Sequence, residues 1–185
     1  GAMPAVYTFH ALFGEYLRSG AAAEFSSDVL RALRVESAGL LACAGYADLA
    51  LGQFVDAQAW TEALQLLDSH AGEFVAQGRS AIVRKAVSVM PDRWRNLPQA
   101  CYWLGFCNLA VDPDAALGQL HRAYEGFLAE DNEQGAFEAA AAIADAIIFR
   151  GSNYDALAPW LPLLERLTPG YLASHDAAQD LRVLP

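Results

Sequence analysis

Residues 103–124 have the sequence WLGFCNLAVDPDAALGQLHRAY, in which a short polar turn separates two segments rich in apolar and small residues. Asp112 is a residue type that caps helix N-termini. Pro113 follows in the first turn, where its missing N–H costs no hydrogen bond. The sequence therefore predicts one helix over 97–109 and a second helix that runs from this turn to about Ala129.

Similar polar turns precede Ala- and Leu-rich segments at 56–63 and 151–155. Recurring helix-turn-helix units indicate helix pairs that stack on one another. Apolar residues at helical spacing predict further helices. Their expected ranges are 10–18, 26–43, 46–55, 60–70, 79–89 and 134–149, followed by a last pair of segments after Asn153. Residues 71–77 are expected either to continue the helix at 60–70 or to form a separate short helix.

Glycine and proline set the expected limits of these helices. Gly20 is expected to stop the first helix, and Gly78 is expected to end the helix before it. The segment 90–98 is expected to be a loop, because the prolines at 91 and 98 forbid a continuous helix. A short extended stretch is expected at 7–9, and no other strand is expected in the chain.

The composition is that of a folded acidic protein, with 185 residues, 55% hydrophobic and 18% charged, and a net charge of −10. Phosphate contacts need clustered cations, so direct nucleic-acid contact by this chain is not expected. Cys43, Cys101 and Cys107 are odd in number and form no CxxC pair, which favours free thiols in a reducing cytoplasm. The longest apolar stretch, 136–149, is short and contains two carboxylates, so no membrane span is expected.

No residue pattern favours catalysis or metal binding. His121 and Glu125 are four residues apart, which predicts a surface helix pair, because no further ligand is in register with them. Neither a nucleophile–base arrangement nor a GxxxxGK[ST] phosphate loop is present. We therefore expect no catalytic residue, no metal and no cofactor in this chain.

Basic residues are concentrated between 79 and 95, where Asp92 is the one opposing charge. One interpretation is a docking patch for an acidic surface, a phosphate or an adjoining domain. The other, which we favour, is a solvated helix face and a loop whose arginines pair with nearby acids. The candidate docking residues are Arg79, Arg84, Lys85, Arg93, Trp94 and Arg95.

Asp145 lies within an apolar run, where a buried carboxylate is costly unless it is paired. If helix pairs stack, this position and residues of the preceding unit line a shared aromatic and acidic groove suited to a small ligand or a peptide. The alternative is a structural ion pair between Asp145 and Arg150 or another arginine. The candidate groove residues are Gln99, Tyr102, Phe106, Glu138, Asp145 and Ile148.

The segment 103–105, followed by Ala116, Leu120, Ala123 and Tyr124, is similar to the tetratricopeptide pattern, although the turn between the two parts is one residue short. The physical basis of that pattern is packing, because Gly105 lets the paired helices touch and the alanines let the second helix nest against its neighbours. The resemblance implies an all-α fold, a right-handed superhelix of stacked antiparallel helix pairs.

A second resemblance covers most of the chain. The segment 7–18, YTFHALFGEYLR, looks like the end of the winged-helix part of maltose-activator-type signal-transduction ATPases that regulate transcription. Residues 56–67, 78–91, 102–107, 112–113 and 145–147 resemble the helical arm that follows it, in a subgroup with a bacterial transcriptional activator module. The resemblance implies the end of a winged-helix module at 4–20 and a tetratricopeptide-like domain at 21–185. Residues 1–3, Gly-Ala-Met, look like a tag remnant, and the start at Pro4 favours an excised fragment of a longer protein.

This resemblance implies the function of the arm, which is to sense a small-molecule inducer or to contact other domains or subunits of the same cytoplasmic regulator. The alternative is a stand-alone tetratricopeptide adaptor that binds a peptide or protein. An all-α hydrolase is a third hypothesis, and no catalytic group in the sequence supports it. Direct contact with nucleic acid or membrane is not expected of this segment.

Overall fold

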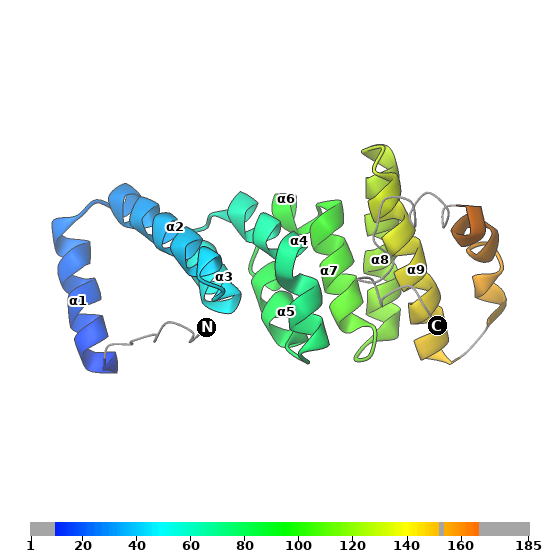
Figure 1. Cartoon of the computed structure of the whole chain (residues 1–185), viewed down its shortest axis with the longest axis horizontal. Coiled ribbons are helices and arrows are strands. Elements are labelled where there is room, and N and C mark those ends of the chain that lie inside the picture. The colour runs from blue at the N-terminus through cyan, green and yellow to red at the C-terminus, as the bar shows by residue number, and fades with distance from the viewer. Residues whose placement is uncertain (1–9, 152–153, 167–185) are drawn as a thin grey trace. The chain divides into compact units, whose positions relative to one another are not determined.

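The computed structural model describes residues 10–151 and 154–166, and every regular element within these ranges is a helix (Figure 1). The predicted all-α class is therefore confirmed for this part of the chain. The chain forms two compact units, Gly1–Ala59 and Trp60–Pro185. The predicted tag remnant at 1–3 and the extended stretch at 7–9 lie outside the described residues.

The first unit consists of α1 (Ala11–Glu24), α2 (Ser27–Cys43) and α3 (Ala47–Asp56). The hydroxyl of Ser26 accepts a hydrogen bond from the backbone N–H of Val29 and caps α2, as its position predicts. Gly45 turns the chain between α2 and α3 at a φ of 84°. The two helices pack on each other, and Ala38, Ala50 and Leu51 are almost fully buried.

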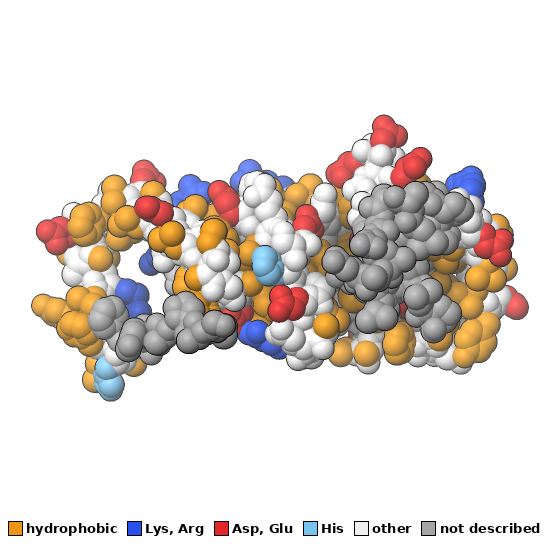
Figure 2. Space-filling view, in the orientation of Figure 1, with side chains coloured by type: hydrophobic (Ala, Val, Ile, Leu, Met, Phe, Trp, Pro, Cys, Tyr) orange, Lys and Arg blue, Asp and Glu red, His pale blue; other side chains and the backbone are white. Residues whose placement is uncertain are grey.

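Helix α1 shares little of this core, because Gly14 is its one buried residue. Figure 2 shows hydrophobic side chains exposed over it. The prediction that Gly20 stops this helix is wrong, since α1 continues to Glu24. A glycine inside a helix costs only about 1 kcal/mol relative to alanine, and the three alanines after Gly20 are the best helix formers. The predicted domain boundary between residues 20 and 21 thus falls inside α1.

The second unit contains α4 (Trp60–Ala76), α5 (Ser80–Ser88), α6 (Asp92–Arg95), α7 (Pro98–Asn108), α8 (Pro113–Ala129), α9 (Glu133–Arg150) and the 3-10 helix η1 (Tyr154–Leu157). Residues 161–166 are also helical. Each long helix packs on a neighbour in the chain, and α7 contacts α4, α5, α8 and α9 (Figure 1). Helix α7 therefore lies at the centre of the unit.

Helix limits in this unit follow local signals. The carboxylate of Asp112 accepts a 3.0 Å hydrogen bond from the N–H of Ala115, which confirms the predicted cap of α8. Gly78 adopts a φ of 72° after α4, a left-handed conformation in which a side chain would be strained. The Asn132 side chain accepts a 2.9 Å bond from the N–H of Gly135 and caps α9, a cap that the sequence analysis missed.

Two predicted segments differ from the structure. The expected loop at 90–98 contains the one-turn helix α6, because Pro91 and Pro98 occupy helix-starting positions, where proline is tolerated. The expected helix around Leu157 is instead η1 and a turn, and helical residues resume only at 161. Pro159 explains this difference, because its ring would clash in a helix interior. The predicted cap at Asn153 lies outside the described residues.

Helices α7, α8 and α9 approach one another through three glycines. A Cβ atom on Gly105 would lie 2.7 Å from Leu120 Cγ, and one on Gly126 would lie 2.5 Å from Pro98 Cγ. A Cβ on Gly135 would lie 2.7 Å from the ring of Phe127. Ala116 and Ala123 of α8 are fully buried. The predicted packing role of Gly105 and of these alanines is confirmed.

We expect Gly105→Ala to destabilise the protein by about 1–3 kcal/mol, because the added methyl group overpacks the α7–α8 contact. Gly118→Ala is the matched control on α8, since a Cβ at that position meets nothing within 4 Å. It should stabilise the protein by up to about 1 kcal/mol through helix propensity alone. Urea denaturation followed by circular dichroism measures both, and equal effects at the two positions would contradict the close-packing argument.

Candidate binding pocket

A pocket of about 290 Å³ opens on the second unit where α4, α7, α8 and α9 meet. Residues of all four helices and of the turn before α9 form its wall. They are Asp68, Gln99, Tyr102, Trp103, Phe127, Asn132, Gln134, Gly135 and Glu138.

Helical spacing brings these residues together. Tyr102 and Trp103 follow Gln99 by three and four residues on α7, so both lie on the same side of the helix as Gln99. Gln134 and Glu138 are four residues apart on α9, and the Gln134 amide donates a 3.2 Å hydrogen bond to the Glu138 carboxylate. Gly135 lies directly against the Phe127 ring, so α9 packs closely on α8. This close packing lets Gln134 and Glu138 of α9 line the same pocket as the α7 residues.

One wall of the pocket is aromatic. The rings of Tyr102 and Trp103 meet edge to face, with centroids 4.9 Å apart, and the Phe127 ring lies 6.4 Å from that of Tyr102. All three side chains are buried. Edge-to-face contacts are a favoured arrangement of aromatic rings, so these contacts stabilise the wall.

The polar part of the pocket is acidic. The indole N–H of Trp103 donates a 3.1 Å hydrogen bond to the Asp68 carboxylate. Partial burial raises the pKa of Asp68, and the hydrogen bond from Trp103 opposes that rise. Glu138 contributes a second carboxylate from another helix, and none of the described residues that line the pocket is basic. The pocket therefore combines negative charge with aromatic faces.

The structure brings together three of the six predicted groove residues, Gln99, Tyr102 and Glu138. The Phe106 ring packs against Tyr102 at 5.8 Å but does not line the pocket. Asp145 follows Glu138 by seven residues on α9, roughly 10 Å along the helix axis. Ile148 lies beyond it and is 53% exposed.

The proposed ion pair between Asp145 and Arg150 does not form. Arg150 instead contacts the Asp114 carboxylate at 3.1 Å and links α9 to the start of α8. Residues four apart could pair along α9, but Arg150 is five residues from Asp145 and points to another helix. Asp145 is half-buried, and burial raises the pKa of its carboxyl.

Sequence reasoning missed six of the pocket residues. Gln134 was the one with a local signal, since it lies four residues before Glu138 and on the same helix face. Nothing in the order of residues places α4 beside α7, so the position of Asp68 could not be predicted. The missed residues are Asp68, Trp103, Phe127, Asn132, Gln134 and Gly135.

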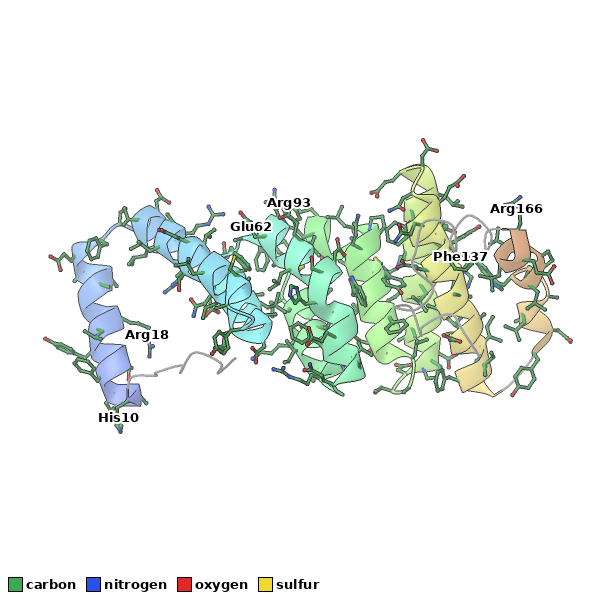
Figure 3. The ribbon with its side chains drawn as sticks, viewed as in Figure 1. His10, Arg18, Glu62, Arg93, Phe137 and Arg166 are labelled. Atoms are coloured by element: carbon green, nitrogen blue, oxygen red, sulfur yellow. The ribbon has the colours of Figure 1, made fainter. Side chains whose placement is uncertain are left out.

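The predicted docking residues are divided between two places. Arg79 precedes α5 and lies over the Phe74 ring. Arg93, which Figure 3 labels, and Arg95 belong to α6, beyond the other end of α5. The intervening helix has nine residues, roughly 13 Å of length. The guanidinium of Arg84 donates a 3.0 Å hydrogen bond to the Cys107 carbonyl near the end of α7, so this side chain has a structural role.

The α6 residues also have partners within the chain. Arg95 pairs with Asp92, and the Arg93 guanidinium lies 5.5 Å from the Trp94 ring centroid. Lys85 is exposed on α5. For Arg95 the structure therefore agrees with the interpretation that arginines of this segment pair with nearby acids.

The described residues contain no group of three or more His, Cys, Asp or Glu side chains that could hold a metal ion. His121 packs against the Trp160 ring at 5.3 Å. Cys101 and Cys107 are buried, and burial raises the pKa of Cys107 to about 11, which keeps this thiol protonated and unreactive at neutral pH. Within the same ranges, no helix has the length and apolar character that crossing a bilayer requires.

No protein-family model, curated protein or solved structure matches the chain.

We expect Asp145→Asn to raise the melting temperature at pH 7 by on the order of 1–3 °C. Burial raises the folded-state pKa of Asp145, so ionisation at neutral pH opposes folding and protonation at low pH relieves that cost. The advantage of the asparagine variant should therefore shrink as the pH falls through the folded-state pKa. Asp155→Asn, at an exposed position, is the control. If the melting temperatures of the variant and the wild type differ by the same amount at pH 3 and at pH 7, the raised pKa of Asp145 is refuted.

Proposed function

We propose that the chain is a helical binding arm of a signal-transduction ATPase-type transcriptional regulator, which senses an inducer or contacts other domains or subunits. The observation that carries the proposal is the acidic and aromatic pocket on α7 and α9, because a built pocket without a catalytic constellation favours recognition over chemistry. The sequence resemblance supplies the regulatory context.

The finer arrangement of the helices belongs to the same proposal. We infer that α4 with α5, and α7 with α8, are successive antiparallel pairs of a right-handed tetratricopeptide-like superhelix, and that α9 begins the next pair. Two observations support this arrangement. The two helices of each pair are in contact. The first helix of each of the three pairs, α4, α7 and α9, contributes side chains to one pocket.

The chemistry of the pocket favours a ligand with a positively charged group. Carboxylates such as Asp68 and Glu138 form charge-assisted hydrogen bonds with ammonium or guanidinium groups. The faces of Tyr102 and Trp103 attract the same cations. A volume of about 290 Å³ is close to the lower limit for small-molecule sites, so the pocket suits a small amine or a single basic side chain.

The second candidate function is a stand-alone tetratricopeptide adaptor that binds a peptide or protein. One observation favours it, because Asp68 at the wall of the pocket is exposed, and a side chain of a bound peptide could reach it from outside. In this case the cationic group is a lysine or arginine of the partner. The adaptor would lack the GxxxxGK[ST] loop that the regulator requires elsewhere in its chain.

Calorimetric titration with butylguanidinium and with its neutral analogue butylurea tests the charge preference. We expect the cation to bind and butylurea to bind at least about tenfold more weakly, because one charge-assisted pair contributes roughly 1.4 kcal/mol or more. Asp68→Asn and Glu138→Gln should each weaken the binding of butylguanidinium. Glu125→Gln, at an exposed position outside the pocket, should not.

A pair of capped peptides separates the two candidate functions. One contains a single arginine, and the other contains citrulline at the same position. Binding of the small cation supports the sensor, whereas binding of the arginine peptide alone supports the adaptor. The proposal fails if neither probe binds, or if citrulline and arginine peptides bind equally well.

A further inference from the structure

The acidic pocket of the second unit offers two carboxylates to a cation. Asp68 reaches it from α4 and Glu138 from α9, and no described residue that lines it is basic. Asp68 accepts a hydrogen bond from the neutral indole of Trp103 and forms no ion pair with a described residue. A guanidinium or ammonium group is therefore the complement that this pocket calls for.

The chain itself carries one such group beyond its described part. Residues 167–185 have the sequence LTPGYLASHDAAQDLRVLP, in which Arg182 is the only lysine or arginine. Leucine precedes it, and valine and leucine follow it, whereas Asp176 and Asp180 lie earlier in the segment. One guanidinium with apolar neighbours matches a pocket that combines carboxylates with aromatic rings.

The described residues just before this segment are anchored on helices that build the pocket. The Trp160 ring packs edge to face against Tyr124 of α8, with centroids 5.1 Å apart, and η1 contacts α9. Phe127, three residues after Tyr124 on α8, lines the pocket. Figure 3 labels Arg166, where this described part of the chain ends. The segment that carries Arg182 therefore leaves from the helices that supply two sides of the pocket.

The length of the segment is sufficient for Arg182 to reach the pocket. Arg182 follows Arg166 by sixteen residues, and a chain of that length can extend over roughly 50 Å. Helix α9 has 18 residues and is roughly 27 Å long. Every position on α8 and α9 is therefore within reach of Arg182.

We propose that Arg182 binds in the acidic pocket of its own chain and competes there with an external cationic ligand. This inference rests on the proposed cation preference of the pocket and adds a regulation of that site. The guanidinium would form a charge-assisted, bidentate pair with Asp68 or Glu138. An external ligand has to displace it, so the C-terminal segment sets the concentration at which the pocket responds.

Covalent attachment makes this competition effective even if the contact itself is weak. A tethered group has an effective concentration on the order of 1 mM at a site within its reach. An arginine that pairs with a dissociation constant of about 0.1 mM would then fill the pocket for about nine-tenths of the time. The apparent affinity for an external cation would be about tenfold lower than its intrinsic affinity.

Calorimetric titration of the whole chain with butylguanidinium tests the competition. Arg182→Gln should bind this cation about tenfold more tightly than the wild type, because the pocket is no longer occupied by the chain's own arginine. Arg166→Gln is the matched control, since it removes the same charge from an exposed position sixteen residues earlier. It should bind butylguanidinium like the wild type.

Modification by phenylglyoxal, which reacts with arginine side chains, gives a second measurement without any added ligand. Mass spectrometry should show that Arg182 reacts more slowly in the wild type than in the double variant Asp68→Asn, Glu138→Gln, which lacks both pocket carboxylates. Arg166 is the internal reference and should react at the same rate in both proteins.

The outcomes separate this inference from the proposed function. Equal butylguanidinium affinities of the wild type and Arg182→Gln, or equal reaction rates of Arg182 in the wild type and the double variant, would overturn the inference and leave the cation site intact. If neither the wild type nor Arg182→Gln binds the cation, the proposed function fails and the inference fails with it. A wild-type dimer in light scattering that Arg182→Gln abolishes would assign Arg182 to the pocket of a second copy and overturn binding within one chain.

Discussion

The second unit depends on the close approach of α7, α8 and α9. Three glycines make that approach possible, because Gly105 lies against Leu120, Gly126 against Pro98 and Gly135 against Phe127. Any side chain at these positions would push the helices apart. Since the faces of α7 and α9 converge only at this separation, the same contacts that form the core also bring Tyr102 and Glu138 to one pocket. Stability and the candidate binding site thus share a single packing constraint.

The first unit has no comparable constraint on α1. Helices α2 and α3 bury a small core, but α1 buries only Gly14 and leaves apolar side chains in water. Exposing such a surface is unfavourable by about 25 cal/mol for each Å² of apolar area, so covering it would stabilise the unit.

Local signals predicted much of the fold. Helix α2 begins after Ser26 and ends at Cys43 as expected, and Asp112 caps α8 because both the cap residue and the following proline are adjacent in the chain. The errors were also local. The run of alanines after Gly20 outweighed the cost of the glycine, and the prolines around α6 occupied helix-starting positions. For the pocket, helix spacing correctly grouped Gln99 with Tyr102 on one face of α7. It could not show which carboxylates face them, since that depends on contacts between helices.

The sequence by itself therefore determined the helical class, most helix limits and the packing positions of Gly105, Ala116 and Ala123, but not those of Gly126 and Gly135. These properties depend on hydrogen bonds and side-chain spacing within a few residues of each position. Only the tertiary structure decided how charged side chains are paired. It placed Asp68 beside Trp103, joined Arg150 to Asp114, and used Arg84 to bind a carbonyl near the end of α7. Long side chains reach several neighbours, and which neighbour is available depends on how the helices are stacked.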